Sequence, residues 1–417
     1  MNIHFYKNLS KGICAFLAFT LIGTSIGAKL NGHSQILNII DIQDKESPNE
    51  TRLIVKLKDG DQRINQRRVS VAQKKQEIAS KAGRLDKKEL KSDALNDSQK
   101  NFVVKVNKSQ AQSSIQSIKQ DSNVEFVEVD RLQKPFLAVN DSIAQYQHVS
   151  TNSGLAWDTT TGQGVLVGVC DTGVDDNHPD LKTNIRADLG YDMFNMSLTG
   201  WNKTEHYHGT MVAGIVAGVG NNRMGIAGTA FGSKIIPIKV SFDNTGSAFT
   251  STIANCIRYA SDKGARVINV SFSGLDSFAI QSASRYAFNR GSVVVFSAGN
   301  TGTNLGYSNS PHILAVGATN RDDTIASFSS TGPFVDIVAP GAGIISTYPG
   351  GQYARSSGTS FSAPIVSGVV ALMMSKNKNL SPSQVVSKIT STATDLGTLG
   401  RDNIFGSGKV NAFKAVQ

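Results

Sequence analysis

Residues 165–171 read VLVGVCD, a short apolar run that ends on a carboxylate. Further apolar runs occur at 234–240 (KIIPIKV), 266–274 (RVINVSFSG), 292–300 (SVVVFSAGN) and 312–318 (HILAVGA), and helical patterns occupy 251–264 and 278–291. Continuous apolar strands that alternate with helices indicate a parallel sheet covered on both faces. The sequence therefore predicts an α/β domain with a doubly wound parallel sheet.

Polar residues follow several of these runs at the point where the strand ends. Asp171 closes the first run, residues 271–274 close the third, and Asn300 closes the fourth. Because sites in such sheets lie at the carboxyl ends of the strands, we expect these residues to share one site. A nucleotide site is excluded, since neither GTGQGVLV nor GSGKV has the spacing of a dinucleotide or phosphate-binding motif.

Most of the excess positive charge lies in the first part of the chain. The 417 residues carry a formal net charge of +10, and Lys+Arg against Asp+Glu is 2 to 0 over 1–28, 21 to 15 over 29–140 and 19 to 17 over 141–417. A domain that binds nucleic acid shows a concentrated basic surface instead. We therefore expect no nucleic-acid partner.

Residues 1–28 have the charged, apolar and small-residue parts of a secretory signal peptide. We predict cleavage near Ala28, a secreted protein and no membrane span after cleavage; the alternative is an uncleaved anchor. Cys14 would leave with this segment. Cys170 lies in an apolar strand pattern and Cys256 in a helical pattern. We therefore predict two buried free thiols, in preference to a disulfide or a metal pair.

Residues 29–138 differ from the rest in being rich in Lys, Gln, Ser and Asp and almost without Gly. Strand-like runs at 51–58, 101–107 and 124–130 flank a helix-permitting basic segment, which predicts a small α+β unit. The polar connector RLQKPFLAVNDS follows the last run. Because such connectors join domains, we place the boundary between residues 138 and 139.

Four blocks carry the functional signal: VCDTGVDDNHPDL (169–181), EHYHGTMVAGIVAG (205–218), SAGN (297–300) and SSGTSFSAP (356–364). In order and spacing they resemble the blocks of the subtilisin-like serine proteases, and the resemblance covers residues 140–417. It implies a serine endopeptidase, acting as a monomer on extended protein and peptide substrates. A catalytically silent relative that serves as a binding or scaffold protein is the alternative.

The resemblance also assigns roles to individual residues. It implies Ser360 as nucleophile, His208 as general base and then acid, and Asp171 as the residue that orients the imidazole. The side chain of Asn300 and the backbone N–H of Ser360 would bind the oxyanion. The other serines of the last block, Ser356, Ser357 and Ser362, are assigned to structure. Substrate-binding residues implied by the same match are Ser271, Phe272, Ser273, Gly274, Thr245, Gly246, Ser297, Ala298 and Gly299, with residues 244–247 as an edge that pairs with substrate.

Calcium is the one metal that the resemblance implies. Asp141, Asp180 and Asn222 match positions that supply oxygen ligands in relatives. Zinc is not expected, because His206 and His208 are two residues apart without a Cys or a third His at metal spacing.

The unit at 29–138 resembles the ferredoxin-like inhibitory propeptide that precedes such a catalytic domain. This implies a precursor that cuts its own chain near residue 139, leaves residues 139–417 as the mature enzyme, and is inhibited by its own propeptide. The alternative is an unrelated adhesive or linker domain.

Overall fold

The computed structural model describes residues 4–6, 50–58, 71–82, 84–85, 101–129 and 139–417. Contacts divide the chain into two compact units: residues 15–134, and residues 135–417 together with residues 1–14. Most of the predicted signal peptide and the connector at 130–138 lie outside the described residues. Among the described helices, none is long and apolar enough to cross a membrane.

The C-terminal unit is built on a parallel sheet of seven strands, which confirms the predicted α/β fold. The strands are β6 (Leu166–Asp171), β7 (Tyr191–Asp192), β8 (Lys234–Lys239), β9 (Val267–Val270), β10 (Val293–Ser297), β11 (Ile313–Thr319) and β12 (Ile337–Pro340). Their order is β12-β11-β10-β9-β6-β8-β7. The first strand, β6, thus lies between β8 and β9. Strand order reverses there, and a site is expected at such a point.

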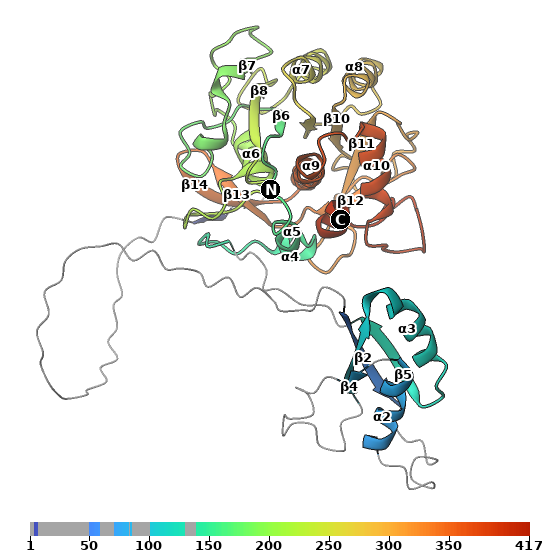
Figure 1. The fold of residues 1–417 in the computed structure, drawn as a ribbon. Coiled ribbons are helices and arrows are strands. Elements are labelled where there is room, and N and C mark those ends of the chain that lie inside the picture. Colours follow the sequence, from blue (N-terminus) through green and yellow to red (C-terminus); the bar gives the residue numbers. More distant parts are fainter. Residues whose placement is uncertain (1–3, 7–49, 59–70, 83, 86–100, 130–138) are drawn as a thin grey trace, which may run out of the picture. The chain divides into compact units, whose positions relative to one another are not determined.

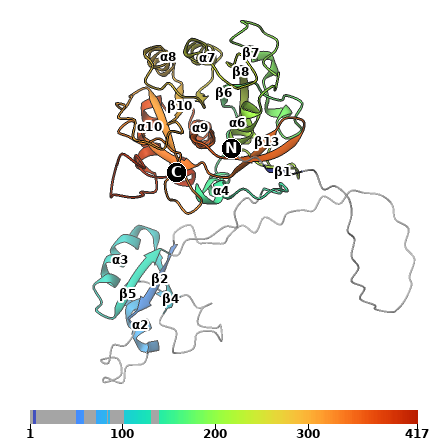
Figure 2. The same ribbon diagram turned by 180° about the vertical axis from the view of Figure 1, so that it is seen from behind.

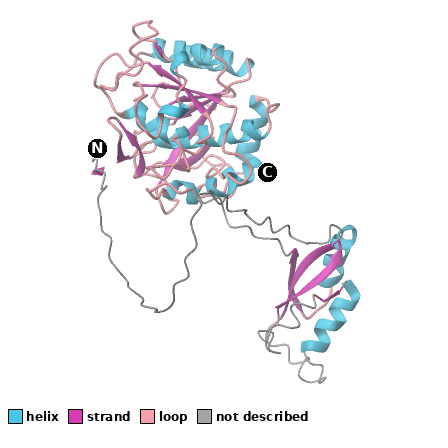
Figure 3. Cartoon of the chain, turned by 60° about the vertical axis from the view of Figure 1, so that its left-hand side comes forward, coloured by secondary structure: helices cyan, strands magenta, loops and turns pink. Residues whose placement is uncertain are grey.

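Helices cover both faces of this sheet (Figures 1 and 3). Helices α7 (Thr250–Asp262) and α8 (Phe278–Asn289) pack on one face, and α6 (His208–Ala217) and α9 (Thr359–Lys376) on the other. Neighbouring strand residues enter opposite cores: Val167 and Val169 pack with α6 and α9, whereas Cys170 packs with α7. This alternation follows from the two-residue period of a strand. Both faces are apolar because both are buried.

Smaller elements complete the unit. Strands β13 (Ile344–Tyr348) and β14 (Gln352–Ser356) form an antiparallel pair, to which β1 (His4–Tyr6) adds at β14. The remaining helices are α4 (Tyr146–Ser150), α5 (Ser153–Ala156), α10 (Pro382–Ser391) and α11 (Ala412–Val416). Helix α10 begins with a capping box between Ser381 and Gln384 and has a proline in its first turn. These are strong start signals for a helix. Figure 2 gives the opposite view.

The N-terminal unit is an α+β unit, as predicted. A four-stranded sheet has the order β3-β4-β2-β5, with β2 at Glu50–Leu57, β3 at Arg84–Leu85, β4 at Asn101–Asn107 and β5 at Val124–Val129. Helices α2 (Val71–Ala82) and α3 (Ala111–Lys119) contribute Ile78 and Ile118 to the core of this unit. Alternate residues of β2, namely Leu53, Val55 and Leu57, are fully buried in that core. The unit therefore has a hydrophobic core of its own.

Cys170 and Cys256 form a disulfide, so the prediction of two free thiols is wrong. Cys170 on β6 and Cys256 on α7 have their Cα atoms 6.0 Å apart, although 86 residues separate them in sequence. Both are fully buried, as predicted. The pairing depends on how α7 lies across β6, and no local pattern in the sequence carries that information.

Candidate active site

The predicted catalytic residues converge at the carboxyl edge of the sheet. Asp171 is the last residue of β6, His208 is the first residue of α6, and Ser360 lies in the first turn of α9. Asn300 follows β10 in the loop beyond Ser297. All but Asp171 line one cleft of about 400 Å³, whose wall consists of Thr172, His206, His208, Gly246, Ser271, Phe272, Ser273, Ser297, Gly299, Asn300, Thr301, Thr359 and Ser360.

A buried carboxylate holds the imidazole of His208 from below the cleft. Oδ1 of Asp171 lies 2.7 Å from Nδ1 of His208 and also accepts the backbone N–H of Thr172 at 2.8 Å. Asp171 is 0% exposed, and its Oδ2 has no hydrogen-bond partner among the described residues. A carboxylate in such surroundings is poorly solvated and interacts strongly with a nearby positive charge. The pair therefore favours an imidazolium at His208.

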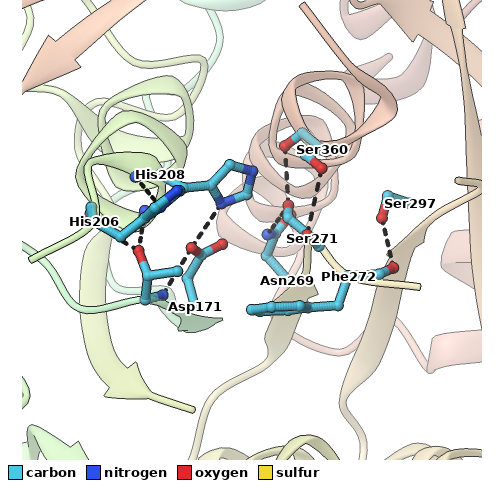
Figure 4. Close-up of polar contacts among 10 residues, drawn as sticks. Asp171, His206, His208, Asn269, Ser271, Phe272, Ser297 and Ser360 are labelled. Carbon is cyan, nitrogen blue, oxygen red and sulfur yellow. Dashed lines mark hydrogen bonds and ion pairs between the residues drawn. The ribbon is translucent and has the colours of Figure 1, made fainter. Parts of the chain in front are cut away.

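The pKa of His208 reflects two opposing effects. Burial lowers the pKa, but the charge of Asp171 and the hydrogen bond to it raise it by more, so the net pKa lies above the ordinary value of 6.5. Nδ1–H is the donor to Asp171 in the neutral ring, which leaves Nε2 as the free proton acceptor. Figure 4 shows His208 between Asp171 and Ser360. The ring can therefore take a proton from the serine side.

Ser360 is presented by the start of helix α9. Its hydroxyl donates to the carbonyl oxygen of Ser271 at 3.3 Å, and its backbone N–H lies in the first turn, where N–H groups lack partners within the helix. The neighbouring serines are committed elsewhere. Ser357 Oγ accepts the N–H of Gly343 at 2.9 Å, and Ser362 Oγ donates to the carbonyl of Ala339 at 3.0 Å. This agrees with the structural roles predicted for both.

The amide of Asn300 is oriented by the residue that precedes Ser360. Its Oδ1 accepts the backbone N–H of Thr359 at 2.8 Å and the hydroxyl of Thr359 at 2.9 Å. With the oxygen fixed by two donors, the amide nitrogen is left to donate elsewhere. Asn300 is exposed to the cleft. An N–H of Asn300 and the N–H of Ser360 can thus serve one developing negative charge.

The predicted substrate-binding residues divide into two groups. Ser271, Phe272, Ser273, Gly246, Ser297 and Gly299 line the cleft. Thr245, Gly274 and Ala298 are not among its lining residues: Thr245 donates to Asp243 at 2.6 Å, Gly274 has a φ of 99°, and Ala298 is 5% exposed. Their contact with substrate stays a prediction.

Other cleft residues were missed from sequence. Thr172, Thr301 and Thr359 each adjoin a predicted residue in the chain, and that adjacency was the available signal. The spacing of His206 and His208 argues against a zinc site, and the sequence predicts no other role for His206. Its Nδ1 accepts the N–H of His208 at 3.3 Å, and burial together with the charge of His208 lowers its pKa below 6.5. His206 is therefore a neutral wall residue at neutral pH.

The residues predicted to bind calcium lie together, away from the cleft. Asn222 donates to both carboxylates: its backbone N–H donates to Oδ1 of Asp141 at 3.1 Å, and its side-chain Nδ2 donates to Oδ1 of Asp180 at 2.6 Å. Burial raises the pKa of Asp180 to about 6, and the charge of Asp141 adds to the increase. Among the described residues, no three His, Cys, Asp or Glu side chains converge as metal ligands.

Known proteins resemble this chain over most of its length. Residues 162–408 match the subtilase family. Thermitase from Thermoactinomyces vulgaris is 41% identical over 282 residues, which cover 66% of this chain and 97% of thermitase. Subtilisin E from Bacillus subtilis is 35% identical over 357 residues, covering 84% of this chain and 87% of its own. A solved protease from Pseudoalteromonas arctica superposes with a TM-score of 0.59 at 31% identity, covering 67% of this chain and 98% of its own. With the cleft described above, these matches show that the chain belongs to the subtilase family and is a serine endopeptidase.

Proposed function

We propose that Asp171, His208 and Ser360 form the catalytic triad of this endopeptidase. The observation that carries the proposal is the 2.7 Å contact between a fully buried Asp171 and a His208 whose ring shares a cleft with Ser360. A serine hydroxyl is a weak nucleophile until a neighbouring base takes its proton. His208 has the free Nε2 that this step requires.

The reaction follows from these positions. Ser360 Oγ attacks the scissile carbonyl carbon while His208 Nε2 takes its proton, and the imidazolium is stabilised by Asp171. The amide side chain of Asn300 and the N–H of Ser360 bind the oxyanion, which lies at the positive end of helix α9. His208 then gives its proton to the leaving amine. A water molecule, deprotonated by His208, hydrolyses the acyl-enzyme and frees Ser360.

Replacement of Ser360 tests the assignment directly. Ser360→Ala should lower kcat by about six orders of magnitude, the size that such losses have in subtilisin. Ser357→Ala is the matched control, because Ser357 lies in the same block but bonds to Gly343. A sulfonyl fluoride should add one sulfonyl group at Ser360, located by peptide mass mapping. A label on another serine, or full activity of Ser360→Ala, would contradict the triad.

We also propose that the enzyme is exported and made as a precursor with an inhibitory N-terminal unit. The sequence of residues 1–28 supports export, and so does the disulfide Cys170–Cys256, because disulfides persist in oxidising compartments. The separate core of the α+β unit supports a propeptide domain. The match to subtilisin E, at 84% of this chain, is longer than the C-terminal unit alone and so extends into the N-terminal one.

The maturation proposal is tested by the precursor itself. The unaltered precursor should shorten to a chain that begins near residue 139, at a rate independent of its concentration. Ser360→Ala should leave both units joined, and addition of active mature enzyme should then release them. Added in excess, the separated N-terminal unit should slow peptide hydrolysis. Normal self-processing by Ser360→Ala would contradict cutting in cis.

Finally, we propose that Asp141, Asp180 and Asn222 hold a calcium ion. Carboxylate and amide oxygens are the ligands that this ion prefers, and the amide of Asn222, whose Nδ2 faces Asp180 and whose Oδ1 accepts the N–H of Met224, would have to turn its oxygen toward the ion. A buried carboxylate whose pKa is raised to about 6 near a second carboxylate is a site where a cation would relieve repulsion. The bound ion would brace the loop around Asn222. Isothermal calorimetry with Ca²⁺ on the parent and on Asp180→Asn tests this: binding should be lost in the variant.

A further inference from the structure

Helix α9 contains a proline that leaves one backbone carbonyl without its helical partner. Pro364 is inside α9 (Thr359–Lys376), five residues after the helix begins. In an α-helix the N–H of residue 364 would donate to the carbonyl of residue 360, but proline has no N–H. The carbonyl concerned is that of Ser360. A donor from outside the helix must therefore satisfy it, or it stays unpaired.

Ser271 supplies that donor. Its hydroxyl donates to the carbonyl oxygen of Ser360 at 2.9 Å, and its own carbonyl accepts the hydroxyl of Ser360 at 3.3 Å (Figure 4). Ser271 directly follows β9 and is 4% exposed. Two hydrogen bonds thus join the first turn of α9 to the end of this strand. The donation from Ser271 holds the backbone of Ser360, which carries the reacting hydroxyl.

Two further buried residues fix the direction of the Ser271 hydroxyl. Ser367 Oγ donates to Oδ1 of Asn269 at 2.9 Å, and Nδ2 of Asn269 donates to Oγ of Ser271 at 2.9 Å. Asn269 and Ser367 are 0% exposed. Since Ser367 occupies the amide oxygen, the amide nitrogen faces Ser271. The hydroxyl oxygen of Ser271 therefore accepts the N–H of Asn269, and its one proton is left to donate to the carbonyl of Ser360.

We infer that Ser367, Asn269 and Ser271 form a buried relay that positions Ser360 for attack. The inference rests on the proposed role of Ser360 as nucleophile. The three are positioning residues in this respect, because the relay acts through Ser360. The physical reason is that a nucleophile displaced by about 1 Å loses a large part of its rate, whereas substrate binding by the rest of the cleft is retained. The relay should therefore act on kcat more than on KM.

A double-mutant cycle on the mature enzyme tests the relay. Ser271→Ala should lower kcat about tenfold and leave KM within about twofold, since an unpaired buried carbonyl allows the first turn to shift. Ser367→Ala should lower kcat about threefold in the parent but change nothing in Ser271→Ala, because the relay is already broken. Ser271→Thr, which keeps the hydroxyl, should recover most of the rate. The pH midpoint at which kcat/KM falls on the acid side should be the same in all these variants, since Asp171 and His208 are unchanged.

Ser292→Ala is the matched control. Its hydroxyl donates to the carbonyl of Ala265 at 2.7 Å and it is 2% exposed, but it precedes β10 at the edge of the sheet opposite the cleft. The Ser292→Ala substitution should lower the melting temperature of the enzyme but should not lower kcat, measured per titrated active site. Independent, multiplicative effects of Ser271→Ala and Ser367→Ala, or an effect on KM alone, would overturn the relay. If the relay fails in this way while Ser360→Ala is inactive, the triad still stands. An active Ser360→Ala would refute the triad itself.

Discussion

Loss of the disulfide between Cys170 and Cys256 should destabilise the C-terminal unit by a predictable amount. The bond closes a loop of 86 residues. The chain-entropy relation for a loop of this length gives about 4.6 kcal/mol at 25 °C. For the proposed mature chain, residues 139–417, an unfolding entropy of roughly 2.1 cal/mol/K per residue converts this to about 8 °C in Tm. The double variant Cys170→Ala/Cys256→Ala should show at least this decrease.

The assay is thermal unfolding of mature enzyme inactivated by a sulfonyl fluoride, which prevents self-digestion. Excess thiol reductant should lower the Tm of the parent toward that of the double variant and leave the variant unchanged. This comparison separates the cross-link from the lost packing of two sulfur atoms. A difference below about 2 °C, or two cysteines that react with a thiol reagent in unreduced, denatured parent, would refute the reasoning. The kcat of the folded variant should change little, because β6 remains paired with β8 and β9 next to Asp171.

Further predictions concern the active-site residues His208 and Asn300 and the proposed calcium ligand Asp180. As pH falls, kcat/KM should decrease with a midpoint above pH 6.5, because the charge of Asp171 raises the pKa of His208. Asp171→Asn should move this midpoint to lower pH and should also lower kcat. A midpoint that Asp171→Asn does not move would argue against the Asp171–His208 pair. Asn300→Ala should lower kcat by about 10² to 10³ with little change in KM, the range found for the matching donor in subtilisin; an unchanged kcat would remove Asn300 from the oxyanion site. With a chelator present, stability should fall as pH rises through about 6, because the raised pKa of Asp180 makes its ionisation unfavourable in the folded state. Since calcium requires the ionised carboxylate, chelation should lower Tm more at pH 7.5 than at pH 5; an equal decrease at both would exclude Asp180 as a ligand.

Much of the fold was predictable because its signals are local. A strand that is buried on both faces is apolar at most positions, so β6, β8, β10 and β11 appear in the sequence as mainly apolar runs. Short strands such as β7, Tyr191–Asp192, carry too few residues for a pattern and were not predicted. Asp171, His208, Asn300 and Ser360 were identified because four blocks of sequence resemble a family. Spacing alone would not have paired them.

The sequence by itself determined the longer strands and helices and their order, the burial of Cys170 and Cys256, and the residues that can do acid–base and nucleophilic chemistry. These depend on side-chain type and on periods of two or 3.6 residues. Only the tertiary structure decided which distant groups meet: the two cysteines of the disulfide, Asp171 and His208, and Ser271 with the carbonyl of Ser360 that Pro364 leaves without its helical donor. Each of these requires segments tens of residues apart to approach within a few ångströms. That approach is set by the packing of helices across the sheet, which no single stretch of sequence encodes.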